Sequence, residues 1–220
     1  MAKAATEQTS NIAQRRLQAK LSGDKDYRER REQLLKAAGK VFQEKGYKGA
    51  SINDIAKAVG IDRASLYYYT SGKEELFREV VHEATLSNVL MAEEVHQSVA
   101  SSREKIGNFI ISLMKSYEEH YPYLYVYVQE DMAQIAGKRT TWAKDMSKLT
   151  KRFNEAIIGI VQAGLDDGTL RDSVGNAQLI TFGIIGMCNW SHRWYKPSGK
   201  LSSETIGQAF AEMVLNGLVR

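Results

Sequence analysis

The fold is decided by residues 46–76, which read GYKGASINDIAKAVGIDRASLYYYTSGKEEL. Within this stretch, Ser51 and Asp54 form a capping-box pattern, which marks the start of a helix. Gly60 then ends that helix, because glycine readily adopts the left-handed conformation that terminates many helices. Residues 51–59 are therefore predicted to form a short helix followed by a tight turn.

A second short helix is predicted over residues 63–69, with Asp62 as its N-cap and Leu66 as its apolar anchor. Two short helices joined by a glycine-containing turn form a helix-turn-helix, whose second helix enters the major groove of DNA. The three tyrosines at 67–69 cannot all face a core, because successive residues of a helix point in different directions. Exposed tyrosines suit phosphate contacts, and the alternative interpretation is an aromatic core cluster.

The same stretch resembles the DNA-binding domain of the TetR family of bacterial regulators. The matching features are the glycine–aromatic pair at 46–47, the hydroxyl residue at the helix start, and the patterns I-A-x-x-x-G-I, S-L-Y-x-Y and K-x-x-L. Thr70 departs from the family, which usually has an apolar residue at that position. This departure is expected to weaken local packing without touching the residues that read DNA.

The resemblance implies a set of residues that contact DNA. Phosphate contacts are implied for Ser51, Tyr67, Tyr69 and Lys73. The groove-facing edge is implied to consist of Arg63, Ala64, Ser65 and Tyr68. Asn53 is expected to reach a base or a phosphate. Within this set, Arg63 is the main candidate for reading a base, because a guanidinium can pair with two acceptors of guanine.

Residues 1–26 are polar and lack an apolar period, so they are predicted to form a flexible basic arm. Residues 1–80 hold 16 lysines and arginines against 11 acidic residues, a balance of +5, whereas the remainder holds 14 against 15. This asymmetry indicates a polyanion-binding module on a near-neutral body. The arm is expected either to lie along a minor groove or to be a weakly contributing tail. The cations of the arm and of the residues just after it are Arg15, Arg16, Lys20, Lys25, Arg28, Arg30 and Arg31.

Apolar residues recur at helical spacing along the rest of the chain. One helix is predicted to begin near Tyr27 and to end at Gly46, and a capping box of Ser71 with Glu74 is predicted to open a long helix. Residues 121–128, YPYLYVYV, alternate with the period of a strand, but no second strand exists to pair with them, so a helix is predicted.

The predicted fold class is all-α, with an N-terminal three-helix helix-turn-helix DNA-binding module and a larger helical ligand-binding and dimerisation domain. The predicted boundaries are 1–26 for the arm, 27–72 for the DNA-binding domain and 73–220 for the ligand-binding and dimerisation domain. Residues 179–187 are apolar nearly all round, which predicts a helix that is buried on most sides.

Residues 189–206, NWSHRWYKPSGKLSSETI, resemble a TetR subgroup with a W-Y-x-P-x-G-x-L motif, whose members regulate fatty-acid or steroid catabolism and respond to acyl-CoA thioesters. An acyl chain needs an apolar tunnel. The candidate lining residues are Phe109, Leu113, Tyr117, Tyr123, Tyr127, Phe153 and Ile157. Arg193 is the candidate cation for a CoA phosphate, with Trp190 and Trp194 to stack on the adenine. Alternatively, the aromatic stripe belongs to the core, and His192 and Arg193 end a helix favourably.

The resemblance implies a repressor that binds a palindromic double-stranded DNA operator as a homodimer and is released by a small hydrophobic ligand. An acyl-CoA thioester is the expected ligand, and a multidrug or other hydrophobic small-molecule sensor is the alternative. Dimerisation is expected through the last two helices, where Gly183, Gly186 and Gly217 permit close approach. Two hypotheses from other classes are a small-molecule binding protein that uses DNA only weakly, and a helical dimer whose basic arm binds nucleic acid without specificity.

Other functional classes lack their sequence patterns. No phosphate-cradling loop, nucleophile elbow or HExxH pattern occurs, so neither an enzyme nor a cofactor or metal site is expected. The single cysteine, Cys188, permits no internal disulfide, which favours a reducing compartment. No cleavable signal pattern begins the sequence, and the longest apolar stretch is too short to span a bilayer. The expected location is the cytoplasm, without membrane contact.

Overall fold

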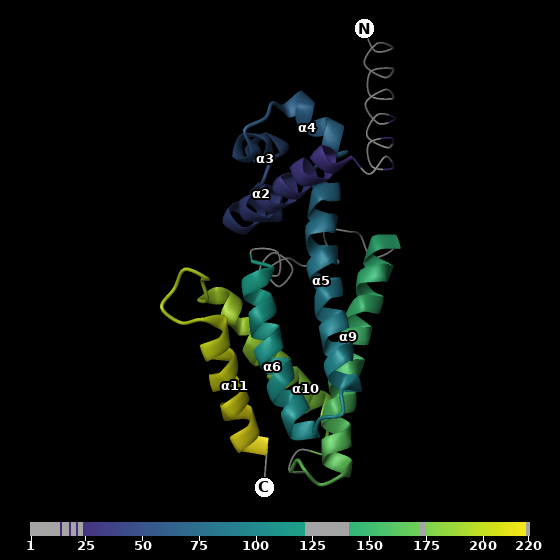
Figure 1. The fold of residues 1–220 in the computed structure, drawn as a ribbon, viewed down its shortest axis with the longest axis vertical. Coiled ribbons are helices and arrows are strands. Elements are labelled where there is room, and N and C mark those ends of the chain that lie inside the picture. Colours follow the sequence, from purple (N-terminus) through teal and green to yellow (C-terminus); the bar gives the residue numbers. More distant parts are fainter. Residues whose placement is uncertain are drawn as a thin grey trace. The chain divides into compact units, whose positions relative to one another are not determined.

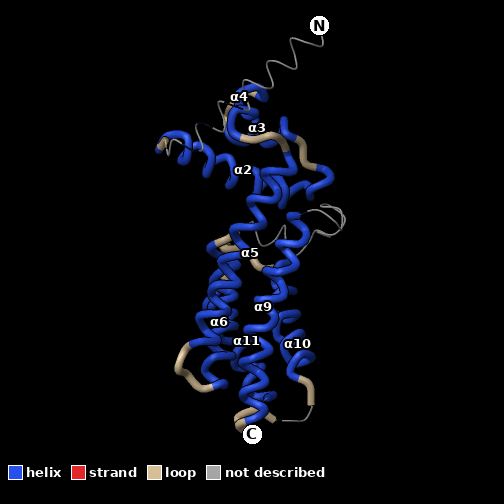
Figure 2. Tube along the Cα trace, turned by 90° about the vertical axis from the view of Figure 1, so that its right-hand side faces the viewer, coloured by secondary structure: helices blue, strands red, loops and turns tan. Residues whose placement is uncertain are grey.

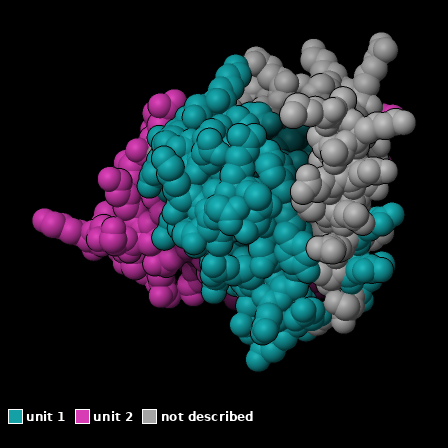
Figure 3. All heavy atoms as spheres, turned by 90° about the horizontal axis from the view of Figure 1, so that it is seen from above, with its two compact units in different colours: residues 1–82 teal, residues 83–220 magenta. Residues whose placement is uncertain are grey.

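The computed structural model describes residues 24–121, 141–171 and 175–218, together with Gln14, Gln18 and Leu21. The chain divides into two compact units, residues 1–82 and 83–220 (Figure 3). In the described ranges all regular elements are helices (Figure 2), and the all-α prediction is confirmed. No helix among these residues is long and apolar enough to cross a membrane. The arm cations Arg15, Arg16 and Lys20, and residues 122–128 of the predicted helix, lie outside the described residues.

The first unit contains α2 (Lys25–Gly49), α3 (Ile52–Val59), α4 (Arg63–Tyr69) and the start of α5 (Lys73–Gln97) (Figure 1). Asp24 caps the start of α2, because its carboxylate accepts the backbone N–H groups of Asp26 and Tyr27. At Gly46 the backbone turns to φ 67°, and helical hydrogen bonding then resumes as far as Gly49. Gly46 therefore ends the first run of helix, as predicted, and a short helical stretch follows it as far as Gly49.

The predicted helix-turn-helix is present in α3 and α4. Asp54 N–H donates to Ser51 Oγ at 3.2 Å, and Ser51 N–H donates to the Asp54 carboxylate at 3.0 Å, which completes the capping box. Gly60 ends α3 with φ 74°, a conformation that costs other residues energy because their Cβ clashes with the backbone. Asp62 caps α4 by accepting Ser65 N–H at 2.9 Å.

The start of α5 differs in detail from the sequence prediction. Ser71 hydrogen-bonds through its N–H and its hydroxyl to Glu75, both at 2.6 Å, whereas Glu74 pairs with Arg78 along the helix. The reason is that α5 begins at Lys73, so that Glu75 rather than Glu74 is its third residue. Helix α5 runs on past His82, the last residue of the first unit, so it belongs to both units.

The second unit contains the rest of α5 with α6 (Ser102–Glu119), α9 (Thr141–Asp166), α10 (Ala177–Trp190), the short 3-10 helix η1 (Ser191–Arg193) and α11 (Ser203–Leu218). Helix α6 packs against α9, α10 and α11, and α10 packs against α9. The predicted apolar stripes meet in one core, to which α6 contributes Ile106, Phe109, Ile110, Leu113, Met114 and Tyr117.

Helix α10 is less buried than its apolar sequence predicts. Leu179 and Phe182 are 60% and 46% exposed, whereas Ile180 and Ile184 are buried. Gly183 and Gly186 lie on the exposed side, where an added Cβ would meet no atom of the described residues within 4 Å. The single chain therefore covers one side of α10 and leaves an apolar stripe on the other.

Candidate functional site

Helix α4 has one buried apolar residue and an exposed polar edge. Leu66 is fully buried, whereas Arg63, Ala64 and Ser65 are exposed. Asn53 on α3 and Ser51, the N-cap of α3, are also exposed. The structure therefore leaves these five predicted DNA contacts accessible in the first unit.

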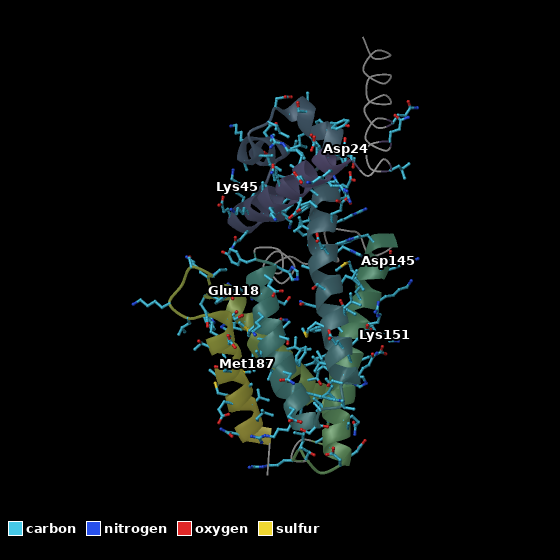
Figure 4. The ribbon with its side chains drawn as sticks, in the orientation of Figure 1. Asp24, Lys45, Glu118, Asp145, Lys151 and Met187 are labelled. Atoms are coloured by element: carbon cyan, nitrogen blue, oxygen red, sulfur yellow. The ribbon has the colours of Figure 1, made fainter. Side chains whose placement is uncertain are left out.

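The two serines of this set already make hydrogen bonds within their caps. Ser51 Oγ donates to Asp54 at 2.6 Å, and Ser65 Oγ donates to Asp62 at 2.5 Å. Lys45, whose side chain is labelled in Figure 4, donates a hydrogen bond to the Asp54 carboxylate at 2.6 Å. This bond, followed by that from Ser51, lowers the pKa of Asp54 to about 2. The hydrogen bonds from Ser65 lower the pKa of Asp62. A phosphate contact through either serine hydroxyl would have to redirect its proton from a carboxylate.

Arg63 lies beside Tyr67 on the surface of α4. Its Nη2 is 3.3 Å from the Tyr67 hydroxyl, and its Cζ lies 5.8 Å from the centre of that ring. The pair is one helical turn apart, which places both groups on one edge. This contact holds the guanidinium at the exposed edge, where the resemblance predicts base reading.

The other two tyrosines pack against Tyr27, a residue that sequence reasoning did not place in the site. The Tyr27 ring stacks on Tyr69 at 5.3 Å between centres and meets Tyr68 edge-on at 5.6 Å. Tyr27 is 4% exposed, whereas Tyr68 and Tyr69 are half-buried. The tyrosine run is therefore divided between an edge that carries Tyr67 and an aromatic contact with α2.

Lys73 makes contacts within the module. Its ammonium donates to the carbonyls of Tyr47 and Ala50 at 2.8 and 2.9 Å and lies 4.5 Å from the centre of the Tyr47 ring. These bonds satisfy carbonyls at the C-terminal end of α2. A lysine there thus holds α2 to α5, a role that its spacing in the sequence does not indicate.

Thr70, the departure from the family pattern, is completely buried. Its hydroxyl donates to the Gly72 carbonyl at 3.0 Å and accepts the Gly72 N–H at 3.2 Å. Because a buried hydroxyl without a partner is costly, this local pair makes the threonine compatible with the core. The expected local weakening is offset by hydrogen bonds across the connection from α4 to α5.

The predicted ligand-lining residues fall into a core group and a surface group. In the core, Phe109, Leu113, Tyr117 and Ile157 are buried, and Phe153 lies 5.8 Å from Phe109 between ring centres. Tyr123 and Tyr127 lie outside the described residues.

The surface group lies at the end of α10 and in η1. Trp190 and Trp194 are 61% and 47% exposed, and Arg193 Cζ lies 5.2 Å from the centre of the Trp190 ring. The Tyr117 hydroxyl donates to the side-chain oxygen of Asn189, the residue before Trp190. This hydrogen bond joins Tyr117 of the core group to the end of α10, which carries Trp190 of the surface group.

Tyr195, in the same motif, faces the opposite way and was not predicted as part of a site. It is 6% exposed, and burial, followed by the negative charge of Glu118, raises its pKa. Glu118, labelled in Figure 4, accepts a hydrogen bond from the hydroxyl of Ser203 on α11. The two aromatic residues of the W-Y pair therefore have different surroundings. Trp194 is partly exposed to solvent, whereas Tyr195 is buried next to Glu118 of α6 and Ser203 of α11.

Two family models match the chain. Residues 34–80 match "Bacterial regulatory proteins, tetR family", and residues 99–218 match "Tetracyclin repressor-like, C-terminal domain". The second model alone covers more than half of the chain.

Among the described residues, no group of three His, Cys, Asp or Glu side chains is arranged to hold a metal ion.

Known proteins are similar over most of the chain. The HTH-type transcriptional repressor KstR2 of Rhodococcus jostii is 27% identical over 190 residues, which cover 86% of this chain and 91% of that protein. The structure of the ketosteroid transcriptional regulator KstR2 of Mycobacterium tuberculosis has a TM-score of 0.80 at 25% identity, and the match covers 87% of this chain and 95% of that one.

AibR, in a crystal structure with isovaleryl coenzyme A and operator DNA, has a TM-score of 0.70 at 19% identity, over 84% of this chain and 97% of that one; it shows the same fold. The family models identify the helix-turn-helix as a TetR-type DNA-binding domain and most of the second unit as a TetR-type C-terminal domain, and the KstR2 relatives agree with both. The chain belongs to the TetR family of bacterial regulators and is a DNA-binding transcriptional regulator rather than an enzyme.

Proposed function

We propose that the chain is a repressor that binds a palindromic operator as a homodimer and is released from it by an acyl-CoA thioester. The observation that carries the proposal is the exposed polar edge of α4, which a capped turn and a buried Leu66 hold in place. The KstR2 relatives, which are named as repressors, support the sign of regulation.

The DNA-binding domain is proposed to comprise residues 27–72, with the remainder forming the ligand-binding and dimerisation domain. Arg63 reads a base, Ala64, Ser65 and Tyr68 line the groove-facing edge, and Asn53 reaches a base or a phosphate. Phosphate contacts come from Ser51, Tyr67, Tyr69 and Lys73. For Lys73 the ammonium has one donor beyond the two that hold α2, since an ammonium carries three N–H groups.

The homodimer is proposed to form through the exposed stripe of α10, with α11 beside it. Leu179, Phe182, Gly183 and Gly186 recur at the spacing of one helix face, and the two apolar side chains are largely exposed in the single chain. Glycine at two of these positions permits a partner helix to approach closely. On α11, Met213 is 65% exposed and adds to the apolar surface. A two-fold dimer matches a palindromic operator, because each half-site receives one α4.

The ligand is proposed to be an acyl-CoA thioester because the second unit carries both kinds of contact that such a molecule needs. Trp190 and Trp194 offer exposed indole rings for an adenine, and Arg193 offers an exposed cation for a phosphate. The core group, represented by Phe109 and Phe153, offers apolar contacts for an acyl chain. AibR, which has the same fold and is described in complex with isovaleryl coenzyme A and operator DNA, supports the proposal.

Release is proposed to occur through α5, the helix that both units share. A ligand that favours one arrangement of the second unit would shift α5, and with it the first unit. Ligand and operator then compete, because each prefers a different conformation, and the coupling is reciprocal.

The test is a gel-shift assay on the DNA upstream of the chain's own gene, with long-chain acyl-CoA, steroid acyl-CoA or free CoA added. The proposal expects a specific complex that an acyl-CoA releases and that free CoA does not. Arg193→Gln should raise the acyl-CoA concentration needed for release without changing operator affinity. Lys196→Gln, which removes an exposed cation three residues further on, is the matched control.

A specific complex that is indifferent to every thioester would refute the ligand and direct the search to drugs and free acids. Equal responses of Arg193→Gln and Lys196→Gln would refute the role of Arg193. Equal binding to unrelated DNA would refute the repressor itself.

A further inference from the structure

Among the basic residues of α2, Arg31 is unusually buried. Only 11% of its side chain is exposed, whereas Lys25 and Lys36 on the same helix are 82% and 63% exposed. Moving a guanidinium out of water is costly unless its charge is paired and its N–H groups are hydrogen-bonded. Arg31 therefore does not belong with the solvated arm cations, and its partners decide its role.

The partners of Arg31 come from two other helices. Its Nη1 donates to the carbonyl of Tyr69, the last residue of α4, and its Nη2 donates to the carboxylate of Glu79 on α5. The same Nη2 lies 3.7 Å from Glu75. Glu75 in turn accepts the N–H of Ser71 at 2.6 Å. One guanidinium on α2 thus joins the end of α4 to α5, beside a carboxylate that holds the connection between these helices.

Helix α4 needs such an external contact to hold its direction. It has only 7 residues, far fewer than the roughly 12–15 that an isolated helix requires to be even marginally stable. Its last carbonyls have no partner within the helix and carry the negative end of the helix dipole. A cation that donates to the Tyr69 carbonyl supplies a hydrogen-bond partner for that carbonyl and a positive charge at the negative end of the dipole. It also leaves the opposite, groove-facing edge of α4 free.

We propose that Arg31 is a positioning residue for operator recognition: by joining the end of α4 to Glu79 on α5, it sets the orientation in which α4 meets DNA. The proposal rests on the proposed function in that α4 reads the operator. It goes beyond that function because the role assigned to Arg31 requires no contact with a base or a phosphate. Any movement of α5 in the first unit would then be passed to α4 through this guanidinium.

The first arm of the test uses the chain without DNA. In Arg31→Gln, backbone amide exchange at Thr70 and Ser71 should become faster by about tenfold, the effect of one charge-assisted hydrogen bond. Exchange at Ile55 in α3, whose N–H donates to the Ser51 carbonyl, should not change. Lys36→Gln, which removes an exposed charge from the same helix, should leave all three amides unchanged.

The second arm compares the operator with random DNA at one salt concentration. Arg31→Gln should lower operator affinity by about tenfold or more and change affinity for random DNA by less than about twofold, because only the specific complex depends on the orientation of α4. Arg31→Lys, which keeps the charge but not the two-pronged geometry, should lie between the parent and Arg31→Gln. Glu79→Gln should also lower operator affinity more than affinity for random DNA. If Arg31→Gln fails to fold, this variant tests whether the Arg31–Glu79 contact orients α4.

Three outcomes overturn the proposal: unchanged exchange at Thr70 and Ser71, unchanged operator affinity in a folded variant, or an equal loss on operator and random DNA. The last would make Arg31 a phosphate contact. If the parent chain itself shows no operator preference, the proposed function fails. The exchange arm still decides whether Arg31 holds α4.

Discussion

The contact of Tyr27 with the reading helix allows a quantitative prediction. Its two ring pairs, at 5.3 and 5.6 Å between centres, lie within the range of favourable aromatic contacts. Each pair contributes about 0.5–1.5 kcal/mol beyond area burial, so Tyr27→Leu, which keeps an apolar side chain, should destabilise the first unit by about 1–3 kcal/mol. Tyr27→Phe keeps both ring contacts and is the matched control.

The assay follows from the placement of the tryptophans. All three, Trp142, Trp190 and Trp194, lie in the second unit. In urea unfolding, far-ultraviolet circular dichroism reports helix in both units, whereas tryptophan fluorescence reports the second. Tyr27→Leu should shift part of the dichroism transition to lower urea and leave the fluorescence transition in place. The reasoning is refuted if Tyr27→Leu is as stable as Tyr27→Phe, within about 0.5 kcal/mol, the usual range of surface substitutions.

Three further predictions concern ionisation, burial and DNA contacts. Because the pKa of Asp54 is lowered from 3.8 to about 2 by Lys45 and then Ser51, its carboxylate stabilises α3 above about pH 4, and that contribution is lost as the pH falls toward 2. An NMR titration of Asp54 should give a midpoint near 2 that rises in Lys45→Gln, and a midpoint near 3.8 would contradict the contact. Burial raises the pKa of the Cys188 thiol to about 12, so Ellman's reagent at pH 8 should label it only after unfolding; full labelling of the native chain would show that the core opens there. Arg63→Ala should relax specificity at one operator position at a cost of about 1–3 kcal/mol, whereas Lys73→Ala should weaken all DNA sequences alike and reduce the salt slope by about one. Identical behaviour of these two variants across a panel of sequences would refute the division of roles.

The local signals of the first unit were readable from the sequence because each acts over a few residues. The capping box of Ser51, the left-handed turn at Gly60 and the Asp62 cap each join positions within three residues or depend on one backbone angle. Leu66 was recognised as the anchor because a short helix has only one inward face. The Ser71 cap was misassigned by one position, since the sequence did not show that α5 begins at Lys73.

Long-range pairings were not readable, because no periodicity or spacing encodes them. Arg31 and Glu79 are 48 positions apart, and Lys73 reaches carbonyls 26 and 23 positions back in the chain. In the sequence, nothing distinguishes Arg31 from the neighbouring arginines Arg28 and Arg30. Its burial emerges only when α2, α4 and α5 are packed together.

The exposed stripe of α10 shows a different limit. Its apolar residues indicated burial, and the single chain leaves Leu179 and Phe182 exposed. A hydrophobic pattern reports that a face is to be covered, but not whether the cover comes from the same chain or from another. The dimer proposed above would reconcile the pattern with the exposure, and Phe182→Glu should then yield monomers in sedimentation.

The central claim is that α4 reads a specific DNA sequence, and the ratio of two affinities tests it most directly. The affinity of the purified chain for the DNA upstream of its own gene is measured beside its affinity for random DNA of equal length, at the same salt concentration. The account predicts that the upstream DNA is preferred by about a thousandfold or more, as for other specific regulators. A ratio near one, with both affinities falling together as salt rises, would contradict it and leave only nonspecific attraction between a basic first unit and phosphates.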